Sequence, residues 1–207
     1  MKKWMYGSLF LCLLLAGCTS QAETKPEKQQ EDYRTDYTVN PQVPDDTNLK
    51  EQEDTVRSRL GVATLENASF KVDTYNLGDI KLTVHETKIL QLTPSHSMID
   101  YFHGLTDRTT FPIAKVFVTI ENTGKKKIQF APFAVASLGK QMWTHEQEVY
   151  LDNLNGTYLP GEIKRGNLGV ILHEKSAGTI QVKTTDVLDE KSKKIQKAAD
   201  WQIILPK

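Results

Sequence analysis

Short runs in which apolar and polar residues alternate recur along the chain after residue 66. In the first clear run, Ile80, Leu82 and Val84 alternate with polar residues, and a period of two places the two kinds on opposite faces of a β-strand. Similar runs occupy residues 114–121, 128–135, 168–172, 179–183 and 201–205, with Asn, Gly and Pro turns between them. Because such turns suit hairpins, the pattern predicts an antiparallel all-β sandwich or barrel.

Residues 1–17 have the pattern of a secretory signal peptide. Lys2 and Lys3 give a positive start, an apolar run follows at residues 9–15, and small residues precede Cys18. The alternative is an uncleaved anchor helix. The apolar run is, however, shorter than the about 20 residues that a membrane-spanning helix needs.

The four residues Leu15 to Cys18 read Leu-Ala-Gly-Cys and resemble the lipobox of bacterial lipoproteins. The resemblance implies cleavage before Cys18 and attachment of a diacylglyceryl group to its sulfur. Two acyl chains anchor a protein stably where one does not. We therefore expect a chain that sits on a membrane without crossing it, with the membrane as its first partner.

Composition narrows the classes of function. The 207 residues include 26 basic and 26 acidic ones, so the formal net charge is zero. A general nucleic-acid binder needs a surplus of Lys and Arg, so we expect no nucleic-acid partner. The two cysteines are Cys12, inside the signal peptide, and Cys18. They exclude a disulfide-dense scaffold and a four-thiolate zinc site.

Residues 18–65 are expected to form a linker. Residues 19–50 are rich in Gln, Glu, Asp, Lys and Thr, and they have too few apolar side chains to offset the entropy cost of ordering. The composition predicts a disordered spacer, in which Tyr33 and Tyr37 are either aromatics of a flexible linker or a partner-binding motif. The folded domain is then expected over residues 66–207.

A short helix is expected over Asp46 to Leu60, at the end of this linker. Leu49, Val56 and Leu60 recur near one face of such a helix. Polar residues at its start suit an N-cap, and Gly61 would end it.

Three segments indicate a family. They are Val116–Gly124, Leu159–Glu162 and Gly166–Ile171, and together they resemble bacterial lipoproteins with an immunoglobulin-like domain. The resemblance covers residues 66–207 and is closest to uncharacterised Bacillus-type lipoproteins, which are related in fold to a mycobacterial immunoprotective secreted antigen. It implies an immunoglobulin-like β-sandwich outside the cell. It implies no enzyme activity, and it carries over no functional residue.

The long segment Pro94 to Phe111 is the candidate interaction loop, because functional residues favour long loops on rigid scaffolds. Its candidate residues are His96, Asp100, Tyr101, His103, Asp107 and Arg108. Histidine and carboxylate side chains also bind divalent metals, and His96 and His103 are the first ligands to test under that alternative. The structural alternative is an insertion whose apolar residues pack onto the end of the sandwich.

Other chemistry has weaker signals. The sequence has no Gly-x-Ser-x-Gly elbow for a nucleophilic serine, so we expect no catalytic residue, no cofactor and no enzyme. The residues Trp143, Thr144 and His145, with Tyr150, either line an aromatic patch for sugars or pack a sheet edge or cover a core.

These observations predict a lipid-anchored protein on the outer face of the cytoplasmic membrane of a Gram-positive bacterium. Its function is expected to be non-enzymatic binding of an unidentified envelope protein or ligand. The alternative is a ligand- or metal-binding accessory of a transporter or envelope enzyme.

Overall fold

The computed structural model describes residues 32–173 and 177–206. The expected signal peptide, the proposed lipid attachment at Cys18 and residues 19–31 of the expected spacer lie outside the described residues. Residues 32 onward form one compact unit of the chain.

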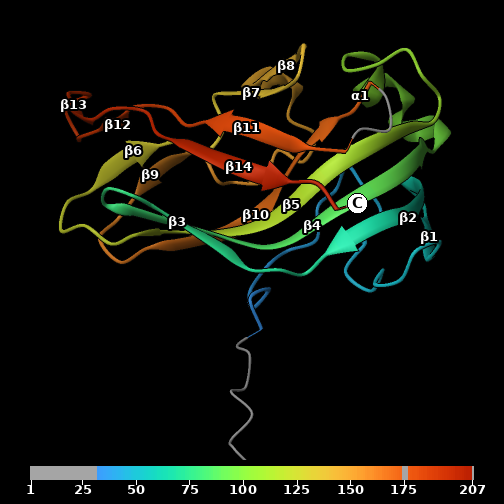
Figure 1. Ribbon diagram of the computed structural model, residues 1–207, viewed down its shortest axis with the longest axis horizontal. Coiled ribbons are helices and arrows are strands. Elements are labelled where there is room, and N and C mark those ends of the chain that lie inside the picture. The colour runs from blue at the N-terminus through green and yellow to red at the C-terminus, as the bar shows by residue number, and fades with distance from the viewer. Residues whose placement is uncertain (1–31, 174–176, 207) are drawn as a thin grey trace, which may run out of the picture. The chain divides into compact units, whose positions relative to one another are not determined.

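A six-stranded antiparallel sheet runs through the domain (Figure 1). Its strands are β1 (Thr55–Ser58), β2 (Gly61–Ser69), β3 (Asp73–Leu77), β4 (Ile80–Pro94), β5 (Phe111–Asn122) and β10 (Ile163–Ile171). Strand β4 is long enough for β3 and β2 to pair one after the other along the same edge, while β5 pairs along the other edge. Strand β10 then pairs with β5.

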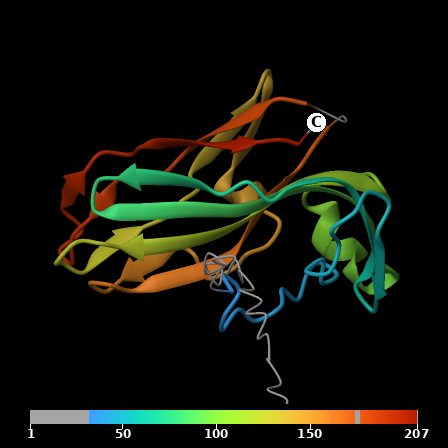
Figure 2. The ribbon, with the colours of Figure 1, turned by 60° about the horizontal axis from the view of Figure 1, so that its bottom comes forward.

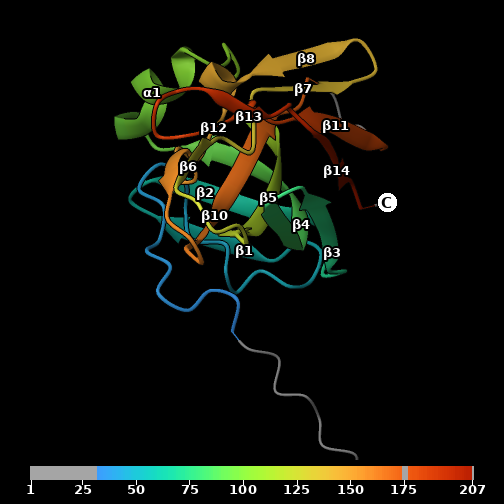
Figure 3. The same ribbon diagram turned by 90° about the vertical axis from the view of Figure 1, so that its left-hand side faces the viewer.

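Two smaller sheets lie over one face of this large sheet, as Figure 3 shows. One has the order β14 (Asp200–Ile204), β11 (Thr179–Lys183), β7 (Val135–Leu138), β8 (Gln141–Thr144); the other has the order β13 (Lys194–Gln196), β12 (Val187–Leu188), β6 (Ile128–Phe130), β9 (Gly156–Tyr158). The all-β prediction is confirmed. No helix among the described residues has the length and apolar character needed to cross a bilayer.

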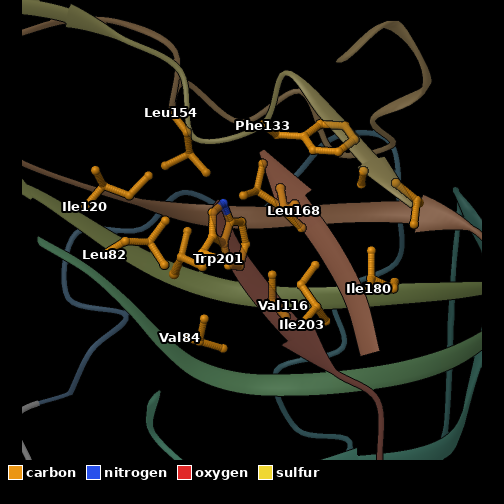
Figure 4. Close-up of a cluster of buried hydrophobic side chains, with 14 of the residues drawn as sticks. Leu82, Val84, Val116, Ile120, Phe133, Leu154, Leu168, Ile180, Trp201 and Ile203 are labelled. Atoms are coloured by element: carbon orange, nitrogen blue, oxygen red, sulfur yellow. The ribbon is translucent and has the colours of Figure 1, made fainter. Parts of the chain in front are cut away.

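The main core lies between the large sheet and the smaller ones (Figure 4). The predicted alternation puts Leu82, Val116 and Leu168 of the large sheet into this core, where they meet Ile180 and Trp201. The Trp201 indole N–H donates to a main-chain carbonyl at 2.8 Å, so this large aromatic residue is buried without an unsatisfied donor.

Residues 32–50, here called the strap, cross the opposite face of the large sheet (Figure 2). The disordered spacer expected there is wrong for these residues. The Tyr33 hydroxyl donates to Glu86 at 2.9 Å, and the Tyr37 hydroxyl donates to Asp152 at 2.9 Å. Both rings also pack against Phe117 of β5. The two tyrosines therefore hold the strap to its own domain.

A buried cluster of charges fastens the strap to the large sheet. Asp46 lies within hydrogen-bond reach of two lysines of the sheet, 3.0 Å from Lys88 Nζ and 2.6 Å from Lys115 Nζ. Glu86 lies 3.2 Å from Lys115 and pairs with Arg34 of the strap. Burial opposes ionisation of Asp46, but the charges of Lys115 and Lys88 outweigh it and hold the pKa of Asp46 below its usual value.

The helix expected over Asp46 to Leu60 is not formed, since β1 occupies Thr55–Ser58 and pairs with β2. Gly61 has a φ of 139°, and a Cβ there would lie 2.4 Å from the carbonyl oxygen of Thr93. It therefore lets the β1–β2 turn pass close to β4 instead of ending a helix. Because β1 and β2 belong to the large sheet, the folded domain begins before the expected boundary at residue 66.

Replacing Asp46 by Ala leaves Lys88 and Lys115 buried without their carboxylate. We expect Asp46→Ala to lower the free energy of unfolding by about 3–5 kcal/mol. Glu51→Ala, at the exposed position directly after the strap, is the matched control and is expected to change it by less than about 0.5 kcal/mol. Urea unfolding measures both. Equal losses in the two variants would show that the strap is not fastened through Asp46.

Candidate functional site

The candidate segment 94–111 forms a cap at one end of the large sheet. It contains the 3₁₀ turn η1 (His96–Met98) and the short helix α1 (Ile99–His103). Phe102 is buried against Phe111, with ring centroids 5.2 Å apart. The Tyr101 hydroxyl donates to the carbonyl of Val149 at 2.6 Å, and burial together with the charge of Glu148 raises the pKa of Tyr101 to about 12. One side of the segment is therefore packing surface.

A pocket of about 340 Å³ lies beside the second half of this segment. Its walls come from the segment, from β8 and the following 3₁₀ turn η2 (His145–Gln147), and from the end of β10. They consist of Leu105, Thr106, Asp107, Arg108, Trp143, Gln147, Ile171 and His173. Of the six candidate residues, the structure thus brings Asp107 and Arg108 into the pocket.

Hydrogen bonds to the end of β10 fix two walls of the pocket. Arg108 donates through Nη1 to the carbonyl of His173 at 3.0 Å and through Nη2 to the carbonyl of Leu172. The Trp143 indole N–H donates to the carbonyl of Ile171 at 3.0 Å. The guanidinium is thereby held in place while Arg108 as a whole stays exposed. A pre-positioned cation next to the Asp107 carboxylate suits a ligand with both polar and charged groups.

The other candidate residues do not line the pocket. His96, Asp100 and His103 are exposed, and Tyr101 is committed to packing. In the described part of the chain, no group of three or more His, Cys, Asp or Glu side chains is placed to hold a metal ion. The structure therefore does not assemble His96 and His103 into a larger set of metal ligands among these residues.

Sequence reasoning missed Gln147 and His173 as pocket residues. A signal existed for Gln147, because Thr144 and Gln147 form a capping box around η2, and a Thr three residues before a Gln is readable in sequence. His173 follows the end of β10, and we find no local pattern that marks it. Trp143 and Tyr150 are buried, so the aromatic sugar patch is not formed and the core interpretation of these two residues is right.

A buried carboxylate lies just after η2. Glu148 accepts hydrogen bonds from the main-chain N–H groups of Tyr150, Leu151 and Gly169 at 2.8–2.9 Å. It also lines a second hollow of about 290 Å³. Burial raises the pKa of Glu148 to about 7, although the three amides favour the ionised form. This carboxyl group therefore changes its charge in the neutral pH range.

Comparison with known proteins gives relatives without a described activity. No protein-family profile matches the chain. The chain is 37% identical to the "Uncharacterized protein YdhF" of Bacillus subtilis (strain 168), over 94% of its own length and 96% of that protein. A crystal structure of a functionally unknown protein from Listeria monocytogenes EGD-e is similar in fold, with a TM-score of 0.51 and 14% identity over 70% of this chain and 89% of that one.

Glu148 makes stability depend on pH. Because its pKa is higher in the folded chain than in the unfolded one, the folded state binds more protons between pH 4.5 and about 7, and its stability falls as pH rises through that range. The free energy of unfolding falls by about 3 kcal/mol across this pH range. Glu148→Gln should remove this part of the pH dependence of the free energy of unfolding, even if the substitution also lowers that free energy at every pH. Urea unfolding across the range measures it, and parallel pH profiles for the two proteins would contradict the assignment.

Proposed function

We propose that this chain, which belongs to the family of the uncharacterized protein YdhF of Bacillus subtilis, is a lipid-anchored, non-enzymatic binding protein. In this proposal, Cys18 carries the lipid at the outer face of the cytoplasmic membrane. The domain from residue 32 onward presents its pocket to a ligand or envelope partner.

The anchoring part of the proposal is supported by the first eighteen residues. A positive start, a short apolar run and the sequence Leu-Ala-Gly-Cys occur together and in this order, which is the order of a secretory leader followed by a lipid attachment site. A diacyl anchor needs no spanning helix, because the buried acyl chains supply the membrane affinity.

The pocket beside segment 94–111 is the observation that carries the binding part. Its volume of about 340 Å³ lies at the lower end of the range of ligand sites, so it fits a small molecule or one side chain of a partner. The walls offer a guanidinium, a carboxylate and an amide, from Arg108, Asp107 and Gln147. Together these groups favour a polar ligand that both donates and accepts hydrogen bonds.

The small volume also favours the second candidate, a ligand-binding accessory of a transporter or envelope enzyme. Under this alternative the pocket takes a free small molecule, whereas an interaction module takes a side chain of a protein. Pull-down from intact cells detects a protein partner of an interaction module. Stabilisation of the folded protein by small-molecule extracts of the envelope detects a free ligand.

The anchor is tested by Cys18→Ala. We expect this variant to leave the membrane fraction or to remain as an unprocessed precursor, because it has no sulfur for lipid attachment. Membrane fractionation and the mass of the N-terminal peptide measure the two outcomes. Membrane binding and processing equal to those of the unchanged protein would contradict lipid attachment at Cys18.

The pocket is tested by Arg108→Ala and Asp107→Asn. Loss of one charge-assisted contact costs about 1.5–3 kcal/mol, so each variant should bind the recovered partner or ligand about tenfold to a hundredfold more weakly. His96→Ala is the matched control, because His96 lies on the same segment, is exposed and does not line the pocket. Unfolding curves confirm that each variant folds. Equal binding by all three variants would rule out the pocket as the site.

A further inference from the structure

The second hollow, which Glu148 lines, has an apolar floor and a mostly polar rim. Its floor contains Phe133, which lies between β6 and β7, and Leu168 of β10; both are buried members of the main core (Figure 4). The rim comes from the exposed residues of η2 and of the loop that follows it. The complete walls consist of Phe133, His145, Glu148, Leu151, Asp152, Asn153, Asn155 and Leu168.

The fixed charges of this hollow are negative. Its lining includes the carboxylates of Glu148 and Asp152 but no Lys or Arg side chain, in contrast to the pocket of the proposed function. Asp152 is held in place by hydrogen bonds from the Tyr37 hydroxyl at 2.9 Å and the Asn40 amide at 2.8 Å. A hollow lined by negative charge, with no fixed cation of its own, raises the local concentration of cations.

Glu148 differs from the other two buried carboxylates of the described residues, because it has no cation beside it. Asp46 pairs with two lysines, and Glu86 pairs with Arg34. Glu148 is only 8% exposed, and the hydrogen bonds that it accepts come from three main-chain N–H groups. A carboxylate buried without a counter-charge gains from a cation that reaches it.

One acceptor position of Glu148 has no donor among the described residues. Two of the three main-chain N–H groups donate to Oε1 and one donates to Oε2. A carboxylate has about four acceptor positions, two on each oxygen, so Oε2 can accept one more hydrogen bond. A primary ammonium group supplies both a positive charge and an N–H donor for this position.

The apolar floor favours an organic cation over a metal ion. Hard divalent cations need about six or more oxygen ligands, whereas Phe133 and Leu168 offer hydrocarbon surface. A narrow gap of about 10 Å³ also lies next to the hollow, between the sheets, and Phe133, Glu148 and Leu168 line both spaces. The remaining walls of the gap are Gly or apolar residues. An alkyl chain attached to the ammonium group therefore has apolar surface to cover.

From these observations we infer that the second hollow is a binding site for a primary alkylammonium group. The nitrogen donates to Glu148, and the alkyl chain packs against Phe133 and Leu168. The inference depends neither on the lipid anchor nor on the pocket beside segment 94–111. The same chemical group ends a free aliphatic amine and the lysine side chain of a protein, so the experiment includes a probe for each source.

The full processed chain, labelled with ¹⁵N and held in micelles of a neutral detergent, is titrated at pH 8 with three probes. They are n-butylammonium chloride, N-acetyl-lysine methylamide and, as the uncharged control, n-butanol. The amide signals of Tyr150, Leu151 and Gly169 report on the site, because these N–H groups donate to Glu148. The indole signal of Trp143 reports on the pocket of the proposed function, which this residue lines.

We expect n-butylammonium to shift the three amide signals to saturation and n-butanol to bind about tenfold or more weakly, because it lacks the charge. Comparable binding of N-acetyl-lysine methylamide supports the site with a protein lysine as the source, and binding of n-butylammonium alone supports it with a free amine. Equal binding of n-butanol overturns the inference, as does the absence of saturable shifts. Shifts confined to the Trp143 indole also overturn it, since they place the cation in the other pocket.

Two variants test the role of the carboxylate. Glu148→Gln removes the charge with little change of shape and should weaken n-butylammonium binding about tenfold or more. Glu146→Gln is the matched control, because Glu146 is an exposed residue of η2 that does not line the hollow. Asn153→Lys puts a competing ammonium group at the exposed rim, where folding is not disturbed, and should weaken binding several-fold even if Glu148→Gln fails to fold. Unchanged binding by Asn153→Lys, or by folded Glu148→Gln, overturns the inference.

Discussion

The carboxylate of Asp46, placed between two lysines of the large sheet, decides how the outer face of this sheet is covered. Lys88 and Lys115 are fully buried, and a buried ammonium group without a partner is strongly destabilising. The strap therefore has one favourable position on the sheet, the one that places Asp46 beside both lysines. Tyr33 and Tyr37 contact the sheet on one side of that point, and the apolar side chains of Val43 and Leu49 are buried near it. Such a charge cluster specifies where the strap lies on the sheet and does not only add stability.

The strands of the core could be predicted because each has one face against the smaller sheets. In the first part of β4 this makes burial alternate with the apolar pattern, as at Leu82, whereas β5 has its apolar residues such as Val116 on the core face and is buried on its other face as well. The strap could not be predicted in the same way. Its few buried residues lie in a polar stretch without a period, and they include an amide and a carboxylate, Asn40 and Asp46. Lys88 and Lys115 occupy the polar positions of strands, where a lysine ordinarily faces water. That both are covered follows from contacts distant in sequence, which a local pattern does not contain.

The candidate site could also be predicted only in part from the sequence. Its length between two strands marked the segment 94–111, and two of its residues, Asp107 and Arg108, line the pocket. The remaining walls come from β8, η2 and the end of β10, which meet the segment because β5 pairs with β10. Periodicity predicted strands in these regions, but the pairing partners that place Gln147 and His173 next to Arg108 depend on the complete sheet order.

The contacts of the strap also have a consequence for the order of folding. Asp46 meets Lys88 and Lys115, 42 and 69 residues later in the chain, and Tyr37 meets Asp152 and Asn167, 115 and 130 residues later. Contacts of such separation form late, because the entropy of closing long loops must be overcome first. Synthesis begins at the N-terminus, so the strap leaves the ribosome before any of its partners and waits until β10 has been made. The first part of this domain to be made therefore cannot complete its contacts until β10 has followed.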